Sequence, residues 1–195
     1  MIGVGGLARA GKDTLSRCLK KVIQDDFGCE VEIVHLADKL KSDLDNLISD
    51  NFHFGAFTEE NSEKELIRPI LVAYGEAKKS QWGKTVWMRR LEEEIKNKNT
   101  KKFFIVSDVR FDFECRYIRD NFDGWNIHIK KNGSEMAVNE TEKENDPLVQ
   151  KEADIKHRWP AYHPDKMHLC EDHATIMWDM IPSEYKDKWR KILNL

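Results

Sequence analysis

The segment that most constrains the fold of this chain lies almost at its N-terminus and reads GLARAGKDT, residues 6–14. It has the spacing G-x-x-x-x-G-K, in which Gly6 and Gly11 allow backbone dihedrals that other residues avoid. The N–H groups of such a loop, and of the helix that follows it, favour an anion. Lys12 adds a positive charge suited to the β- and γ-phosphates of a nucleotide. The segment predicts a phosphate-binding loop (P-loop) that binds a nucleoside triphosphate.

The residues on either side of the loop have the pattern that the motif requires. Residues 1–5 form a short apolar run that predicts a strand, and apolar positions within residues 14–25 recur at helical spacing. The residue after the lysine is Asp13, where Ser or Thr is usual, so Asp13 and Thr14 are both candidate ligands of Mg²⁺. The alternative interpretation is a glycine-rich turn without a ligand.

Strands and helices are expected to alternate along the rest of the chain. The strongest buried-strand pattern is FFIV, residues 103–106, and a short last strand is expected near 167–169. Other strands are predicted at 30–35 and 125–129, and helices at 36–48, 62–77, 85–98, 111–121, from about 174, and at 183–193. This order predicts an α/β fold of the P-loop NTPase type, with helices covering both faces of a parallel sheet. Ligands of such sheets bind at the carboxyl ends of the strands.

We expect one P-loop domain with two added segments. The segment 131–165 is polar and rich in lysine, so it predicts a mobile lid that contributes little to the core. The helical segment 38–83 is expected to bind a second substrate, which would accept a phosphoryl group from the triphosphate. The core is expected to comprise residues 1–37, 84–130 and 166–195.

Composition excludes several classes of protein. The 195 residues suffice for one sizeable domain, and a net charge of −3 gives no field that attracts nucleic acid or an anionic membrane. The four cysteines are scattered, which favours reduced thiols in a cytoplasmic protein. No signal peptide and no apolar run of membrane-spanning length is found.

Two charged residues follow the central strand. Asp108 has the position of an acidic residue that orients Mg²⁺, although it could instead cap the next helix. Arg110 suits bidentate binding of phosphate, and its alternative is a surface ion pair. We therefore predict catalytic roles for both residues beside Lys12.

The acceptor and the lid are assigned their own candidates. Arg68 precedes Pro69, which predicts a kink or a new helix start that would place Arg68 near a helix N-terminus and an acceptor phosphate. Its alternative is a solvated helix charge. Arg158 is the preferred lid cation, against a solvated loop charge. Nearby side chains that could contact a base are Tyr74, Gln81, Trp82 and Trp87, although most aromatic residues serve packing.

A histidine- and cysteine-containing segment near the C-terminus does not favour a metal site. His163, His168, Cys170 and His173 have a spacing that matches no common zinc pattern.

Five segments together resemble one family, the bacteriophage deoxynucleoside monophosphate kinases, which are P-loop kinases related to the animal type of phosphomevalonate kinase. The resemblance covers about residues 1–130, and its carriers are GLARAGKDT, HLADKLK, RPILVAYGE, SQWGKTVWMRRL and VSDVRFDFE. It implies ATP with Mg²⁺ as donor and a deoxynucleoside 5′-monophosphate as acceptor, in the host cytoplasm if the chain is phage-encoded. By position, it places Lys12, Asp13 and Thr14 at the donor, and Asp38, Arg68 and Arg110 at the acceptor. We add Gly6, Arg9 and Gly11 as further candidates at the donor, and Lys39 at the acceptor.

The expected reaction is in-line transfer of the γ-phosphoryl group of ATP to a phosphate oxygen, with charge neutralisation and positioning as the main catalytic effects. One alternative is a P-loop kinase of a non-nucleotide phosphate such as phosphomevalonate. Another is a nucleotide-dependent switch, although a guanine-reading N-K-x-D is absent and only NKNT, residues 97–100, comes near it. The expected partners are small molecules, and a homodimer is allowed.

Overall fold

The structure is a computed structural model that describes residues 1–98, 101–133, 137, 139–160, 166 and 168–195. The chain forms two compact units, which are described separately. The first comprises Met1–Val34 and Thr100–Leu195, and the second comprises His35–Asn99. Among the described residues, no helix is long and apolar enough to cross a membrane.

A five-stranded parallel sheet forms the centre of the first unit. Its order is β2-β3-β1-β4-β5, and the strands are β1 (Ile2–Gly5), β2 (Glu30–Val34), β3 (Lys102–Val109), β4 (Trp125–Lys131) and β5 (Ile155–Trp159). β1 is central and fully buried, as its two glycines and two β-branched residues allow. Gly5, its last residue, pairs with Val109 on one side and with His128 on the other. The expected α/β fold with a parallel sheet is confirmed.

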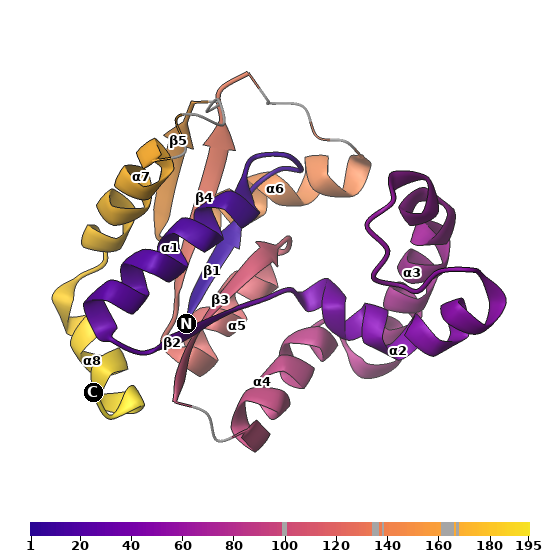
Figure 1. Ribbon diagram of the computed structural model, residues 1–195, viewed down its shortest axis with the longest axis horizontal. Coiled ribbons are helices and arrows are strands. Elements are labelled where there is room, and N and C mark those ends of the chain that lie inside the picture. Colours follow the sequence, from indigo (N-terminus) through magenta and orange to yellow (C-terminus); the bar gives the residue numbers. More distant parts are fainter. Residues whose placement is uncertain (99–100, 134–136, 138, 161–165, 167) are drawn as a thin grey trace. The chain divides into compact units, whose positions relative to one another are not determined.

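Helices cover both faces of this sheet (Figure 1). They are α1 (Lys12–Phe27), α5 (Asp112–Phe122), α6 (Glu140–Glu152), α7 (His168–Asp179) and α8 (Ser183–Leu193). α1 lies in front of the strands in Figure 1 and packs on α7, whereas α5 and α6 lie behind the strands and pack on each other. The main core joins Leu15 and Leu19 of α1 to Met177 of α7 and Trp189 of α8. Because α7 begins at His168, the strand expected near 167–169 is wrong for residues 168 and 169; residue 167 lies outside the described residues.

The segment 131–165 contributes more to the core than its polar composition indicated. Its strand β5 pairs with β4, and Val149 of α6 is buried. Asp146 of α6 also contacts the buried His128 at 2.8 Å. The expectation that this segment contributes little to the core is therefore wrong for α6 and β5. An edge strand and an amphipathic helix each bury only one face, so both can pack on the core although their composition is largely polar. A lid function of this segment stays a prediction.

Three helices make up the second unit: α2 (Leu36–Asn51), α3 (Asn61–Trp82) and α4 (Val86–Lys98). Its small core consists of Leu44, Ile48, Ala56 and Ile67, with Phe52, Phe54 and Tyr74 packed against them. α4 packs on α2 and α3, so this unit includes residues beyond the range 38–83 that the sequence suggested.

Pro69 does not interrupt α3. The helix runs without a break from Asn61 to Trp82, so the predicted new helix start at Pro69 is wrong, and a kink there stays a prediction. Proline removes one N–H donor, and the remaining hydrogen bonds of a 22-residue helix tolerate that loss. Arg68 therefore lies on the exposed surface in the interior of α3, and the argument that placed it near a helix N-terminus is wrong.

Candidate active site

The P-loop joins β1 to α1 and has the backbone conformation that its glycines allow. Gly6 has φ of +140° and Gly11 has φ of +92°, both in the region that favours glycine. Arg9, at the exposed tip of the loop, also has a positive φ of +62°. A left-handed conformation is unfavourable for a residue that carries a Cβ, and such strained residues concentrate at functional sites. The loop therefore has an unusual geometry at three positions.

Close packing also requires these two glycines. A Cβ at Gly6 would lie 2.4 Å from the carbonyl oxygen of Ile129 in β4. A Cβ at Gly11 would lie 2.6 Å from the indole ring of Trp159 in β5. The loop is thus pressed against the carboxyl-terminal halves of β4 and β5, where ligands of parallel sheets bind.

Lys12 spans the loop. Its ammonium donates hydrogen bonds to the carbonyl oxygens of Gly6 at 2.7 Å and Leu7 at 2.8 Å. Lys12 is also the first residue of α1, whose N-terminal N–H groups have no partner within the helix. A positive charge and helix N–H groups at one place form an anion site.

Four charged side chains lie near enough to the Lys12 ammonium to affect its pKa. Burial lowers the pKa of Lys12, and the charge of Arg110 acts in the same direction. The carboxylates of Glu142, Asp13 and Asp108 have the opposite effect on that pKa. The structure therefore brings together Lys12, Asp13, Asp108 and Arg110, as the sequence predicted, and adds Glu142 of α6, which sequence reasoning missed. A bound phosphate would favour the charged form of Lys12.

The predicted metal ligands lie beside the loop. Asp13 is exposed in the first turn of α1, and its Oδ1 accepts a hydrogen bond of 3.4 Å from the hydroxyl of Ser107. Asp108 is buried near the end of β3, and Thr14 is partly buried next to Asp13. Because Mg²⁺ in kinases is held by one or two carboxylates together with substrate phosphates, this donor set fits the ion.

The buried Glu114 caps the start of α5. Its Oε2 accepts the N–H groups of Arg110 at 2.7 Å and Phe111 at 3.0 Å. The two interpretations of Asp108, as a residue that orients Mg²⁺ and as a helix cap, stay predictions. The side chain of Arg110 is exposed, while its backbone is fixed by Glu114.

Arg158 and Trp159 end β5 and face opposite sides of the sheet. Arg158 is exposed and pairs in register with Lys130, so it lies on a strand of the sheet. Trp159 is buried and donates its indole N–H to the carbonyl oxygen of Ala10 at 2.8 Å. Sequence reasoning missed Trp159, since only its position before Pro160 at the end of an alternating segment marks it.

The predicted acceptor residues lie in the second unit. Asp38 is partly buried in the first turn of α2, and Arg68 is exposed on α3. Lys39 forms an ion pair with Glu94 of α4. Their roles toward an acceptor stay predictions.

The aromatic candidates of this unit differ in exposure. Tyr74 donates its hydroxyl to Asp43 at 2.9 Å, and its ring packs 6.4 Å from that of Trp87. Trp87 is buried, so it has less free surface for a base than Trp82, which is 56% exposed. Gln81 is exposed beside Trp82 at the end of α3. Trp82 and Gln81 are thus the more accessible of the predicted base contacts.

The described part of the histidine- and cysteine-containing segment forms no metal centre. No group of three or more His, Cys, Asp or Glu side chains that could hold a metal ion occurs among the described residues. His163 lies outside them. His173 instead forms a 2.6 Å hydrogen bond with His157 of β5, while Cys170 is a buried free thiol.

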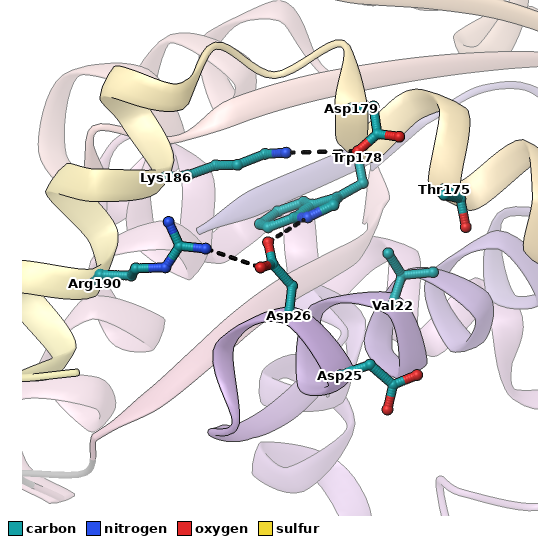
Figure 2. Close-up of a pocket in the computed structure, with 8 residues that line it drawn as sticks. All are labelled: Val22, Asp25, Asp26, Thr175, Trp178, Asp179, Lys186 and Arg190. Atoms are coloured by element: carbon teal, nitrogen blue, oxygen red, sulfur yellow. Dashed lines mark hydrogen bonds and ion pairs between the residues drawn. The ribbon is translucent and has the colours of Figure 1, made fainter.

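An open depression of about 560 Å³ lies between α1, α7 and α8 (Figure 2). In it, Asp26 accepts hydrogen bonds of 2.8 Å from the Trp178 indole and from Arg190, and Lys186 lies over the Trp178 ring. Asp26 is in the last turn of α1, about 20 Å along the helix from Lys12 at 1.5 Å per residue. Because Arg190 already pairs with Asp26 and Lys186 with Asp179, we place the active site at the P-loop and not here.

Comparison with known proteins identifies one family. The family model of phosphomevalonate kinase matches residues 4–124, which include the P-loop, the second unit and β3. A search of curated proteins gave no match. Among solved structures, dephospho-CoA kinase from Campylobacter jejuni is 17% identical, with 88% of this chain and 93% of that chain covered at a TM-score of 0.42.

Proposed function

The chain belongs to the phosphomevalonate kinase family, and we propose that it transfers the γ-phosphoryl group of ATP to the phosphate of a deoxynucleoside 5′-monophosphate. The products would be ADP and the deoxynucleoside diphosphate. The observation that carries the kinase part of this proposal is the grouping of Lys12, Asp13, Asp108 and Arg110 around a P-loop with two glycines of positive φ.

The mechanism relies on charge and position. The acceptor phosphate oxygen is already a nucleophile, so the protein need not supply a strong base. Lys12 and Arg110 stabilise negative charge that builds on the transferred phosphoryl group. Asp13 and Asp108 would hold or orient Mg²⁺, which would supply further charge neutralisation. Arg158 is our candidate for a further cation, at the end of β5.

The second unit supports a nucleotide as acceptor. Arg68 offers an exposed cation suited to a phosphate, and Trp82 offers an exposed aromatic face of the kind on which bases stack. An acceptor without a base would not need such a face. Asp38 and Lys39, in the first turn of α2, are proposed to contact the same acceptor.

A non-nucleotide phosphate is the second candidate acceptor. The family match favours it, since the matching model is that of phosphomevalonate kinase. The donor half of the site is the same in both cases. The two candidates differ only in what the second unit recognises.

A panel of acceptors separates them. We would measure ADP release with ATP and Mg²⁺ in the presence of each deoxynucleoside monophosphate, each ribonucleoside monophosphate and phosphomevalonate. Our proposal predicts stimulation by at least one deoxynucleoside monophosphate, reduced by Trp82→Ala. Stimulation by phosphomevalonate alone would replace the proposed acceptor, and ADP release that no acceptor stimulates would contradict a phosphotransferase.

A further inference from the structure

Trp159 connects the edge of the sheet to the P-loop. It is the last residue of β5, only 3% exposed, and lies 149 positions from Ala10 in the sequence. Its indole N–H donates to the Ala10 carbonyl oxygen at 2.8 Å, and its six-membered ring covers the Cα of Gly11. Its own carbonyl oxygen accepts the N–H of Asn132 at 2.9 Å, which fixes the strand end beneath it. The side chain is thus held by the sheet and in turn contacts two consecutive loop residues.

These contacts fix one peptide plane of the loop. In a trans peptide, the carbonyl and the N–H point in opposite directions. Holding the Ala10 carbonyl toward the indole therefore aims the Gly11 N–H away from it. Glycine restricts the rotation of its neighbouring peptides less than other residues do, so this plane would otherwise turn easily. The hydrogen bond and the ring above Gly11 both oppose that rotation.

We infer that Trp159 is a positioning residue for the phosphoryl donor, which keeps the Ala10–Gly11 peptide and the start of α1 in the conformation that binds phosphate. This inference rests on the proposed function, because it requires ATP to bind at the P-loop. Lys12 follows Gly11 directly, so rotation of this peptide would also move the lysine. Trp159 would orient the N–H groups of the loop and the Lys12 ammonium, which donate hydrogen bonds to phosphate. The indole itself would not contact the reacting atoms.

A matched pair of variants tests the inference. Trp159→Phe keeps an aromatic ring and removes the N–H donor. Trp189→Phe is the control, because Trp189 is 2% exposed and donates its indole N–H to the carbonyl oxygen of Asp123 at 2.9 Å, on α8 of the same unit. Both changes remove one hydrogen bond from a buried tryptophan to a backbone carbonyl. They differ in whether that carbonyl belongs to the P-loop.

The measurement is calorimetric titration of the full chain and both variants with ATP and Mg²⁺. We expect Trp159→Phe to raise the Kd of ATP at least about tenfold, as loss of a buried hydrogen bond allows, and Trp189→Phe to leave it within about twofold. A fraction of the protein that is unfolded in equilibrium raises the apparent Kd by the inverse of the folded fraction. Urea unfolding of both variants therefore supplies the folded fraction by which each Kd is corrected. If the Kd of ATP is the same for Trp159→Phe and Trp189→Phe, the inference is overturned, whereas the proposal that ATP binds at the P-loop is unaffected.

Fluorescence supplies a second readout. ATP should change the tryptophan emission of the wild-type chain and of Trp189→Phe, and this change should be lost in Trp159→Phe. An undiminished change in Trp159→Phe would contradict the inference. Failure of the wild-type chain to bind ATP in either assay would instead overturn the proposed function, and the inference with it.

Discussion

Replacing Gly6 by alanine should damage both the stability of the first unit and its affinity for ATP. The φ of +140° is strained for alanine, and the new Cβ would lie 2.4 Å from the Ile129 carbonyl oxygen. Ordinary contact would require the loop and β4 to separate by about 1 Å. Strain of about 1–3 kcal/mol and overpacking of similar size predict a loss of about 3 kcal/mol in the free energy of unfolding.

Gly28→Ala is the matched control. Gly28, after the last residue of α1, also has a positive φ of +64°, but no atom lies within 4 Å of a Cβ built there. It should lose only about 1 kcal/mol, the cost of a left-handed alanine. Urea unfolding measures the difference, and titration with ATP measures the functional effect. The Gly6 carbonyl also accepts a hydrogen bond from Lys12, so a moved loop carries the lysine with it.

The two variants therefore separate the cost of backbone strain, which both share, from the cost of the steric clash, which only Gly6→Ala has. Gly6→Ala should be about 2 kcal/mol less stable than Gly28→Ala and should bind ATP more weakly, while Gly28→Ala keeps wild-type affinity. If both variants lose the same stability and bind ATP equally, the close packing of the loop against β4 has no energetic role and our reasoning about this glycine is refuted.

Three further predictions concern other parts of the molecule. Burial raises the pKa of the Cys115 thiol to about 12, so it should react with a thiol reagent at pH 8 only as fast as the protein opens; reaction as fast as free cysteine would contradict this. Burial and the neighbouring charge of His173 lower the pKa of His157 below its usual 6.5. The unfolded state therefore binds this proton more readily, and the free energy of unfolding should fall as pH drops below about 6.5. Urea unfolding from pH 5 to 8 should show a weaker fall in His157→Gln, and an identical fall in both proteins would refute the assignment. Arg90 binds Asp43 through both terminal guanidinium nitrogens. Arg90→Lys should therefore destabilise the second unit by roughly 1 kcal/mol, as expected for a partly exposed charged pair; an unchanged melting temperature would contradict this.

Local patterns predicted the parts of the fold that depend on neighbours in sequence. The P-loop, the buried strand that contains Phe104 and Val106, and the last helix at 183–193 form where the sequence indicates. In these segments glycine placement, a continuous apolar run or helical spacing determines the local conformation.

Contacts between distant residues could not be predicted in the same way. β5 reads IKHRW, and its charges suggested a solvated segment, although Ile155 and Trp159 alternate as on an edge strand with one buried face. The hydrogen bond from Trp159 to Ala10 leaves no local signal, because it depends on the strand order of the finished sheet. Pro69 had the opposite effect: a strong local signal of interruption was overridden by the rest of α3.

The most direct test of a kinase built on this P-loop is transfer of labelled phosphate. With ATP labelled at the γ-phosphate, Mg²⁺ and a mixture of deoxynucleoside monophosphates, the wild-type chain should produce a labelled deoxynucleoside diphosphate. Lys12→Ala, in which the ammonium that spans the loop is missing, should lose nearly all of this transfer while remaining folded. Near-normal transfer by folded Lys12→Ala, or label released by the wild-type chain only as free phosphate, would contradict the account.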